Sequence, residues 1–514
     1  MAVSRTVSSF VVRYPVWTVS LVSALTILLI YYQLALKPKR AKLPVYSNHT
    51  GFFASWNDAL EYVRDSPGVL KRGYDKYSRN GQFFQLRTPA RWVIVVPPRF
   101  IEEIRTAAPH ELSARVAAND VQRAKYTISP ICEDNKFHFS AIKTHLTPSL
   151  ETKINDLLEE ITLVFQEEVG KPTEWKAIPA ARAAHRIATR TANKLLVGAP
   201  LCRNEEYLQM SMRYAIDVFQ GADKLRSWPD LLKPLVTRMV TRVAERQEVA
   251  RKHLLPYIRE RLAFSGDLSS AAEKTAKDRP VDSLQWCIET APNELERDPE
   301  RLMYRLLHLN VAAVHTTSVT FLNALYDLAL HQEVHDELRD ECTTVFQEDG
   351  WTTKGLNKLW KLDSFMVESQ RLAPIASSQM TRAVVSDFTF SDGTHVPAGS
   401  YVLVPMHAMY LDDDLYPSSA TFDAFRWSRL REQPGNENRY QFVSTSAGHI
   451  NFGHGRDACP GRFFASQEIK LLLAYTLLNY DLELTDPTGL PKPSWYDRSR
   501  MPNQTAQVNF RARK

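Results

Sequence analysis

Apolar residues recur at helical spacing over most of this chain. From residue 99 to about 260, and again from 284 to 373, the pattern of apolar and polar positions is mainly helical. Its most apolar part, residues 306–330, predicts one long buried helix. Residues 463–478 have the same character and predict a second buried helix near the C-terminal end.

Shorter runs between these segments predict strands. Residues 83–86 and 92–96 are rich in aromatic and β-branched residues and are separated by Thr88-Pro89, which is typical of two strands of a small sheet. Residues 380–405 are also strand-like, with Asp392-Gly393 as a hairpin turn. The expected fold class is therefore mainly α with small β sheets.

The N-terminal residues predict a membrane anchor. Residues 14–36 carry no charge, are rich in Leu, Val and Ile, and are long enough to cross a bilayer core with some tilt. More Lys and Arg residues follow this segment than precede it, which places the following body in the cytosol. A buried core helix is the alternative. The expected parts are a short lumenal N-terminus, a single-pass anchor, a basic neck containing prolines and one cytosolic domain: residues 1–13, 14–36, 37–44 and 45–514.

Composition limits the function classes. The chain has 514 residues, of which 44% are hydrophobic and 24% charged, as in globular proteins with a large core. A net charge of +6 is small for this length and argues against a nucleic-acid-binding protein. The five cysteines are widely scattered without a CxxC pair, which fits a reducing compartment rather than a disulfide framework.

Residues 452–465 contain the strongest candidate chemistry. Gly453 and Gly455 allow a tight turn or the close approach of a flat ligand. Pro460 is expected to be the first residue of the helix that follows. Cys459 would then lie at a helix N-terminus, where free N–H groups and the helix dipole favour a thiolate. Such a thiolate is a good ligand for a soft or borderline metal, although a buried structural cysteine is the simpler alternative.

One cysteine cannot build a zinc site, but it can be the axial ligand of a haem. The run Phe452-x-x-Gly455-x-x-x-Cys459-x-Gly461 resembles the haem-binding loop of cytochromes P450. This resemblance implies the P450 fold and a haem b cofactor whose iron is bound by the thiolate of Cys459. It also implies that Phe452, Gly455 and Gly461 contact the cofactor.

A second motif lies in the long apolar segment. Ala312 and Ala313 are small enough for a flat ligand to lie close, and Thr316 can donate a hydrogen bond to the carbonyl of residue 312. The stretch resembles the oxygen-activation segment of P450s, with Thr316 as the catalytic threonine. His315 stands where the family usually has an acidic residue; a histidine can relay protons near neutral pH.

A third motif combines Glu368 and Arg371, which share one helical face, with Arg426 farther along the chain. Together they resemble the Glu-Arg-Arg triad of P450s, whose role is folding and haem retention. By default a Glu/Arg pair three residues apart is a surface ion pair. Its position in the chain favours the triad here.

Haem propionates require cationic partners. The resemblance assigns Arg382 to this role and, less directly, Lys143. The family usually has a basic residue two positions before the cysteine, where this chain has Asp457. We expect the neighbouring Arg456 to replace it.

The resemblance covers essentially the whole chain and implies a monooxygenase that inserts one atom of dioxygen into a substrate. Ser283-Leu284-Gln285-Trp286 and Gly453-His454-Gly455 are similar to fungal P450s of secondary metabolism, most of all the ent-kaurene-oxidase-like and indole-diterpene enzymes. A lipophilic terpenoid substrate (diterpene, indole-diterpene or meroterpenoid) is therefore expected. Five pocket positions follow from the family: Val311, Ala312, Ile375, Ala376 and Met501.

The expected partners follow from what the chain lacks. No G-x-G-x-x-G motif follows a strand, so electrons must come from another protein. The resemblance implies an NADPH–cytochrome P450 reductase in the endoplasmic reticulum membrane, with cytochrome b5 as an optional second donor. Two other interpretations share these motifs: a haem-thiolate isomerase or dehydratase that consumes no oxygen, and a non-catalytic membrane haem protein.

Overall fold

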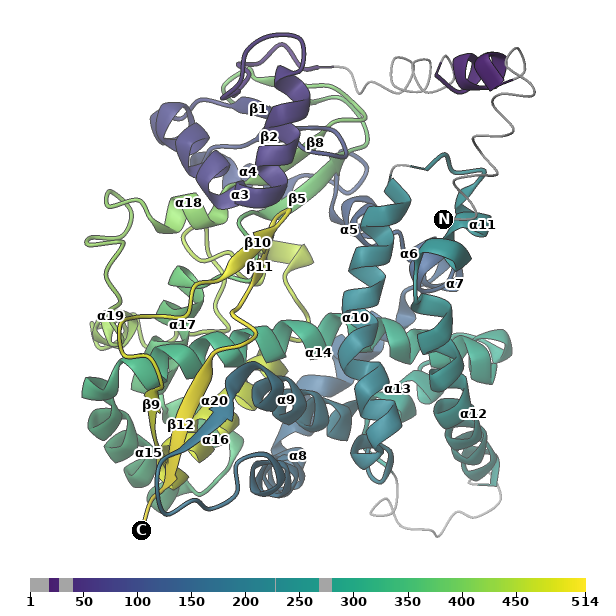
Figure 1. Cartoon of the computed structure of the whole chain (residues 1–514). Helices are drawn as coiled ribbons and strands as arrows, with labels where there is room; N and C mark the ends of the chain where they lie inside the picture. The colour runs from purple at the N-terminus through teal and green to yellow at the C-terminus, as the bar shows by residue number, and fades with distance from the viewer. Residues whose placement is uncertain (1–17, 27–39, 227, 268–279) are drawn as a thin grey trace.

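The computed structural model describes residues 18–26, 40–226, 228–267 and 280–514 (Figure 1). These residues form a mainly helical protein with four small sheets, so the expected fold class is confirmed. Residues 268–279, which lie between the two predicted helical regions, are outside the described residues.

The long helix α14 (Pro299–Leu330) crosses the middle of the molecule (Figure 1). It is packed against α8 (Phe137–Glu168), α9 (Ala180–Leu196), α10 (Glu205–Arg226) and α20 (Arg462–Asn479). The helix begins two turns earlier than its apolar pattern suggests. Asp298 caps it by accepting a hydrogen bond from the N–H of Arg301, and Pro299 occupies the first turn, where proline is tolerated.

Shorter helices surround this centre, and the helix α17 (Trp360–Leu372) also packs on α14. The others are α3 (Ala54–Lys76), α4 (Ile101–Thr106), α5 (Ala114–Gln122), α6 (Ala124–Thr127), α7 (Ile131–Asp134), α11 (Lys233–Val240), α12 (Val243–Asp267), α13 (Ser283–Glu289), α15 (His335–Asp349), α16 (Thr353–Lys358), α18 (Met406–Tyr410) and α19 (Arg426–Arg431).

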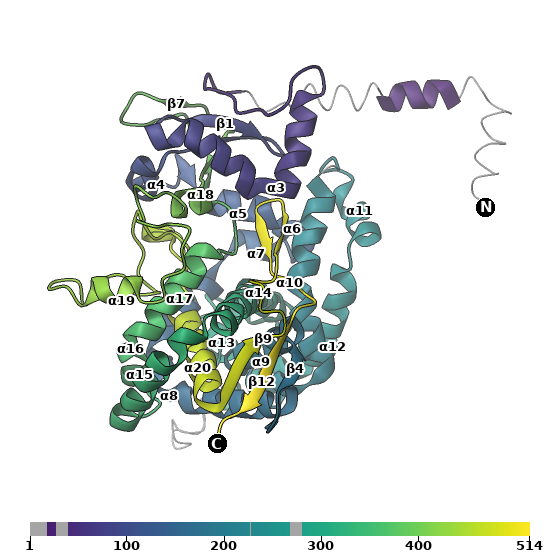
Figure 2. The ribbon, with the colours of Figure 1, turned by 60° about the vertical axis from the view of Figure 1, so that its left-hand side comes forward.

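The largest sheet lies at one end of the molecule, beside α3 (Figures 1 and 2). Its strand order is β1 (Phe84–Arg87), β2 (Trp92–Val95), β8 (Tyr401–Val404), β5 (Gln379–Val384) and β3 (Leu112–Ser113). The two predicted strands at 83–96 form the antiparallel pair β1–β2. β2 and β8 are parallel, whereas β5 is antiparallel to β8 and β3.

The other sheets are small. One has the order β4 (Lys176–Pro179), β12 (Gln507–Ala512) and β9 (Tyr480–Leu484), so it joins the C-terminal strand to a distant part of the chain. The hairpin of β6 (Phe388–Thr389) and β7 (His395–Val396) contains the predicted turn, with Gly393 at a φ of +84°. The hairpin of β10 (Ser494–Tyr496) and β11 (Ser499–Met501) precedes the last strand.

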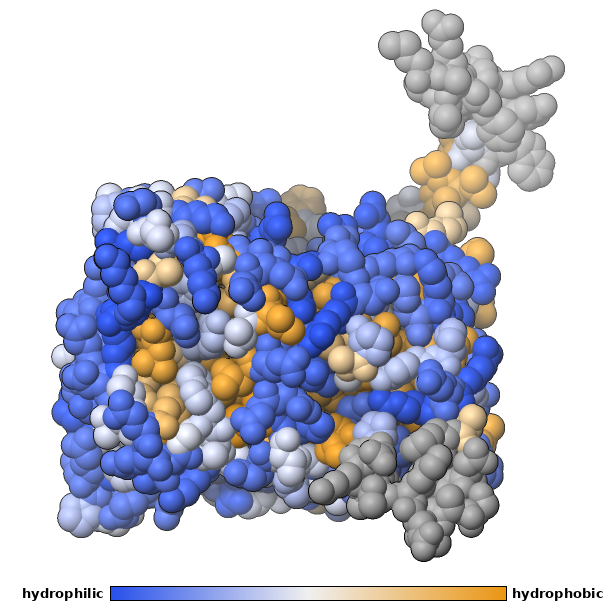
Figure 3. Space-filling model, turned by 90° about the horizontal axis from the view of Figure 1, so that it is seen from below, coloured by the Kyte–Doolittle hydropathy of each residue, from blue (hydrophilic) through white to orange (hydrophobic). Residues whose placement is uncertain are grey.

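Side chains of the described body bury one large apolar core and a smaller one under β1 and β2. Hydrophilic residues dominate the face seen in Figure 3, with hydrophobic residues scattered between them. Within the predicted anchor, residues 18–26 are helical and present Val19, Leu21 and Leu25 to solvent. The rest of the anchor lies outside the described residues. Among the helices that are described, none is both long enough and apolar enough to span a bilayer.

Candidate active site

The loop before α20 holds Cys459 by backbone hydrogen bonds. The N–H of Cys459 donates to the carbonyl of Phe452 at 2.8 Å, and the N–H of Ala458 donates to Gly455 at 3.1 Å. Gly455 adopts a φ of +77°, and a Cβ there would lie 2.1 Å from the Arg105 side chain of α4. The loop therefore needs glycine both for its backbone conformation and for its packing on α4.

The helix after the cysteine starts later than expected. Arg462 is the first residue of α20 and Gly461 is its N-cap, so Pro460 precedes the cap instead of opening the helix. The N–H of Ala465 donates to Gly461, while the guanidinium of Arg462 turns back to the carbonyl of Cys459 at 2.9 Å. Cys459 thus lies three residues before the helix, still within reach of its N-terminal N–H groups.

Burial raises the pKa of the Cys459 thiol, and three groups act in the opposite direction. The N–H groups of Gly461 and Arg462 donate hydrogen bonds to its sulfur, and the positive charge of Arg462 also lowers the pKa. A metal cation bound to the sulfur would supply the remaining charge that burial requires. The surroundings of Cys459 therefore fit a thiolate ligand of a metal ion.

Arg382 on β5 is a buried cation with an unused donor. Its side chain is 5% exposed, and its Nε is buried without a hydrogen-bond partner among the described residues. One Nη donates to the carbonyl of Thr381 at 3.1 Å, and the other lies 3.4 Å from a carboxylate oxygen of Asp457. Burial lowers the pKa of Arg382; Asp457 raises it and the nearby charge of Arg456 lowers it. Two guanidinium groups thus gather beside the cysteine loop.

The other predicted cationic contacts differ in position. Arg456 is exposed and donates to the carbonyl of Ala107 at 3.1 Å. Lys143 lies exposed on α8, and no interaction within the described ranges connects it to the cysteine loop. The structure therefore brings Arg382, Arg456 and Cys459 into one region of the molecule and leaves Lys143 apart from their interactions.

The middle of α14 has an open face. Ala312 is exposed although its neighbours Val311 and Val314 are buried, so a space adjoins the helix at this point. The Thr316 hydroxyl donates to the Ala312 carbonyl at 2.8 Å, as its position four residues later suggests. A partly buried thiol, a buried cation with a free donor and a helix face of small side chains fit a flat, anionic, iron-containing porphyrin.

His315 has a partner that the sequence did not indicate. Its imidazole stacks on that of His185 from α9, with ring centroids 6.3 Å apart and planes 5° from parallel. Burial lowers the pKa of both rings. The pKa of His185 falls to about 4, because burial and the nearby charge of His315 both lower it. Both imidazoles are therefore neutral near pH 7, and a neutral imidazole can accept a proton on one nitrogen and donate from the other.

Three of the five predicted pocket residues lie together. Residues Ile375 and Ala376, which follow α17, are joined by main-chain hydrogen bonding to the strand that ends in Met501. The N–H of Arg500 donates to the carbonyl of Ile375 at 3.0 Å, and Ala376 pairs with Ser499. Ala312 faces open space on α14, whereas Val311 is buried in the core.

The predicted triad is assembled around the carboxylate of Glu368, which is fully buried. Arg371 donates to it at 2.7 and 2.9 Å, and Arg426 donates from Nε at 3.2 Å. Trp427, next to Arg426, adds an indole N–H at 3.1 Å. Sequence reasoning missed this last donor because a tryptophan beside the second arginine looks like an ordinary core residue. Arg371 also donates to the carbonyls of Tyr410 and Ser419, so α17 holds the end of α18 and the segment that follows it.

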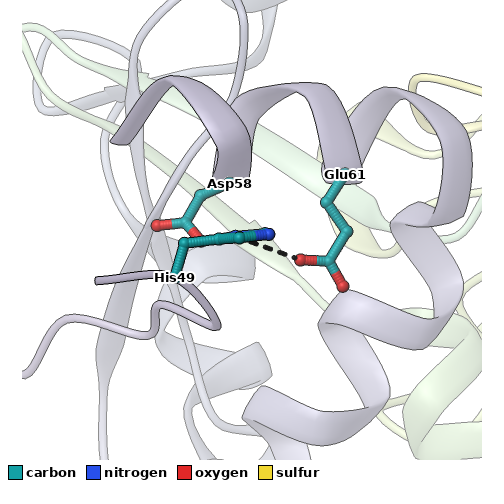
Figure 4. Close-up of side chains that lie close together, drawn as sticks. All are labelled: His49, Asp58 and Glu61. Atoms are coloured by element: carbon teal, nitrogen blue, oxygen red, sulfur yellow. Dashed lines mark hydrogen bonds and ion pairs between the residues drawn. The ribbon is translucent and has the colours of Figure 1, made fainter. Parts of the chain in front are cut away.

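A separate group of metal-ligating side chains lies near the start of the body. The atoms of His49, Asp58 and Glu61 that could bind a metal lie within 4.8 Å of one another (Figure 4). His49 is 2.9 Å from Asp58 and 3.7 Å from Glu61, and Arg72 already neutralises Glu61 at 2.6 Å. We interpret this group as a hydrogen-bonded anchor of residues 47–49 on α3.

Comparison with known proteins agrees with this arrangement. A family profile described as Cytochrome P450 matches residues 66–510. The chain is 36% identical to Cytochrome P450 monooxygenase 151 of Postia placenta, over 89% of this chain and 91% of the relative. It is 30% identical both to Cytochrome P450 monooxygenase olcJ of Penicillium canescens, over 96% and 93%, and to Ent-kaurene oxidase P450-4 of Gibberella fujikuroi, over 92% and 93%.

The profile and these relatives cover nearly the whole chain, and the family implies a haem cofactor with a cysteine thiolate as axial ligand. The chain therefore belongs to the cytochrome P450 family and is an oxidoreductase of its monooxygenase class.

Proposed function

We propose that this protein is a haem-thiolate monooxygenase that acts on a lipophilic terpenoid, with Cys459 as the axial ligand. The observation that carries this proposal is the surroundings of Cys459, a partly buried thiol with two N–H donors and Arg462 beside it. The bound haem supplies the activation of dioxygen, one atom of which enters the substrate while the other is reduced to water. The protein's own residues bind the cofactor, hold protons and shape the pocket.

Arg382 and Arg456 are proposed to bind the haem carboxylates. The unused Nε of Arg382 provides a donor for a propionate, and Arg456 adds positive charge at its side. Asp457 partly neutralises the charge of Arg382, so this propionate-binding site carries less positive charge than two unpaired arginines would. Phe452, Gly455 and Gly461 are proposed to be the loop residues that would contact the bound cofactor.

Thr316 and His315 are proposed to hold the proton that the oxygen chemistry consumes. The Thr316 hydroxyl, bonded to Ala312, keeps its oxygen free to accept a hydrogen bond from water in the open space beside α14. His315, next to Thr316 on α14, and its stacked partner His185 on α9 are neutral imidazoles, which are proposed to pass a proton toward Thr316. In this proposal, His185 and His315 together take over the proton transfer that the family's usual acidic residue would perform.

Replacing Thr316 by Val removes the hydroxyl at nearly constant volume. We expect product formed per NADPH consumed to fall on the order of 10²-fold, the lower end of what a positioned proton-transfer group supplies. Thr316→Ser retains the hydroxyl and is expected to stay close to the parent. Unchanged coupling in Thr316→Val would exclude this residue from proton delivery.

The terpenoid substrate is proposed from kinship and from the pocket. Two relatives are named ent-kaurene oxidases, and the proposed pocket residues Ala312, Ile375, Ala376 and Met501 are all apolar. Electrons are proposed to come from an NADPH–cytochrome P450 reductase, with cytochrome b5 as an optional donor.

We also propose that the protein works at the endoplasmic reticulum membrane with its body in the cytosol. Besides residues 14–36, two parts of the body expose large apolar side chains. Phe52, 94% exposed, precedes α3, and Leu231, 90% exposed, precedes α11. Both helices lie in the upper part of the molecule (Figures 1 and 2). Retention of the full chain in yeast microsomes after alkaline extraction is the expected result; release into the supernatant would contradict a spanning anchor.

The deciding experiment is product mass. The full chain is expressed with a reductase in yeast, diterpene and indole-diterpene scaffolds are supplied, and the gas phase contains heavy oxygen. A product that carries one labelled oxygen atom supports the monooxygenase and identifies the scaffold. Without oxygen, a product of unchanged mass would favour the isomerase, and a product lighter by one water would favour the dehydratase. A thiolate-type spectrum without any product would contradict the terpenoid assignment alone.

A further inference from the structure

A second buried carboxylate on α17 lies away from the Glu368 triad. Asp363 is 2% exposed, and both of its oxygens are used. One accepts from the Nζ of Lys470 at 2.6 Å. The other accepts from the N–H of Phe442 at 2.8 Å and lies 3.6 Å from the guanidinium of Arg431. Lys470 and Arg431 are themselves 4% and 2% exposed, so all three charges are removed from water.

The cations of this cluster come from two different elements. Lys470 is on α20, eight residues after its first residue, and it also donates to the carbonyl of Leu356 at 3.0 Å. At about 1.5 Å per residue, eight residues of helix place Lys470 about 12 Å from the start of α20. Arg431 ends α19 and stacks on Trp360, the first residue of α17. Asp363 therefore ties α20 and α19 to α17.

The hydrogen bond from Phe442 connects Asp363 to the segment that precedes Cys459. The ring of Phe442, fully buried, packs edge-on against Phe452, with centroids 5.3 Å apart. Phe452 accepts the hydrogen bond from the N–H of Cys459. Arg462, the first residue of α20, also contacts this segment: it donates to the carbonyl of Val443, next to Phe442, at 3.1 Å.

We propose that Asp363 is a positioning residue that fixes Cys459 from both sides, through Lys470 on the helix after it and through Phe442 on the segment before it. This role rests on the proposed ligand function of Cys459. It is separate from that of Glu368, which holds Arg371, Arg426 and Trp427.

The physical basis is the cost of an unpaired buried charge. Without the carboxylate, the Lys470 ammonium remains buried with a single carbonyl partner, and Phe442 loses the acceptor of its N–H. Either α20 shifts so that Lys470 reaches water, or segment 442–452 loosens. Both responses move the N–H donors that stabilise a thiolate at Cys459.

The test compares Asp363→Asn with a matched variant elsewhere. Glu160→Gln also removes a fully buried carboxylate from an ion cluster, in this case among α8, α9 and Arg203, where it lies 2.7 Å from that arginine. The readouts are the carbon monoxide spectrum of the reduced full-length protein and the rate of haem transfer to an acceptor apoprotein.

We expect Asp363→Asn to convert the thiolate-type band to the neutral-thiol type and to weaken haem retention roughly 10- to 100-fold, as for other residues that orient metal ligands. Glu160→Gln is expected to keep the parent's band. Asp363→Asn combined with Lys470→Gln also removes the ammonium that Asp363→Asn alone leaves without its carboxylate, so only Arg431 remains charged, and this variant is expected to recover the thiolate band.

Two results would overturn the inference: a parent-like band and haem retention in Asp363→Asn, or the same loss in Glu160→Gln. A parent protein that itself lacks the thiolate band would instead overturn the ligand assignment of Cys459. The two failures are therefore distinguishable.

Discussion

Cys459→Ser is expected to abolish monooxygenase activity and the thiolate-type carbon monoxide spectrum. The sulfur is the only proposed ligand that the chain gives to iron, and a serine hydroxyl is a much weaker donor of electron density. Variants that only disturb the partners of metal ligands lose about 10- to 100-fold, so loss of the ligand should exceed about 100-fold. Activity is measured as the amount of product carrying labelled oxygen that forms when a reductase supplies the electrons.

Cys287→Ser is the matched control for this variant. Cys287 is a fully buried thiol on α13, and burial raises its pKa to about 12, so it is a neutral core residue. Its replacement should affect stability without changing the spectrum. A thiolate-type spectrum that survives in Cys459→Ser would show that another residue binds the iron.

Glu368→Gln is expected to lower the apparent free energy of unfolding by about 3 kcal/mol or more, within the range of 3–5 kcal/mol for breaking a buried ion pair. Arg371 is 1% exposed, and the amide would leave its charge uncompensated. The same change frees Arg426 and Trp427, so the segment at 421–431 should separate from α17 and haem content should fall. Urea unfolding and haem absorbance measure the two effects.

An exposed pair of the same spacing provides the comparison. Glu294 lies 3.1 Å from Arg297 on the surface, with 87% of its side chain exposed. Glu294→Gln should change stability by no more than about 1 kcal/mol, because water already screens the pair. Equal effects of the two substitutions would contradict the structural role of the triad.

Sequence alone predicted the features that residues close together in the chain form. The cysteine loop, the long apolar helix and the hydrogen bond from Thr316 to Ala312 all depend on residues a few positions apart. The pairing of Glu368 with Arg371 belongs to the same class. The start of α20 was placed wrongly: Pro460 was expected to be its first residue, whereas Gly461 is the N-cap and Arg462 is the first residue.

The missed residues share a different property. His185 reaches His315 from another helix, and Lys470 reaches Asp363 across more than a hundred residues of chain. Neither pair has a characteristic spacing, and a lysine in an apolar helix looks like a surface residue until its burial is known. Such contacts depend on how helices cross, which the pattern of one sequence does not record.

The wall that carries Ile375 and Ala376 is attached to the strand of Met501 through main-chain atoms. Main-chain hydrogen bonds form with almost any side chain, so substitutions at these positions can reshape the pocket while the backbone stays in place. Apart from Arg382 on β5, the residues proposed to retain the cofactor lie elsewhere, on α17, α19 and the loop before α20. We therefore expect single substitutions at Ile375 or Ala376 to change substrate preference without a loss of haem.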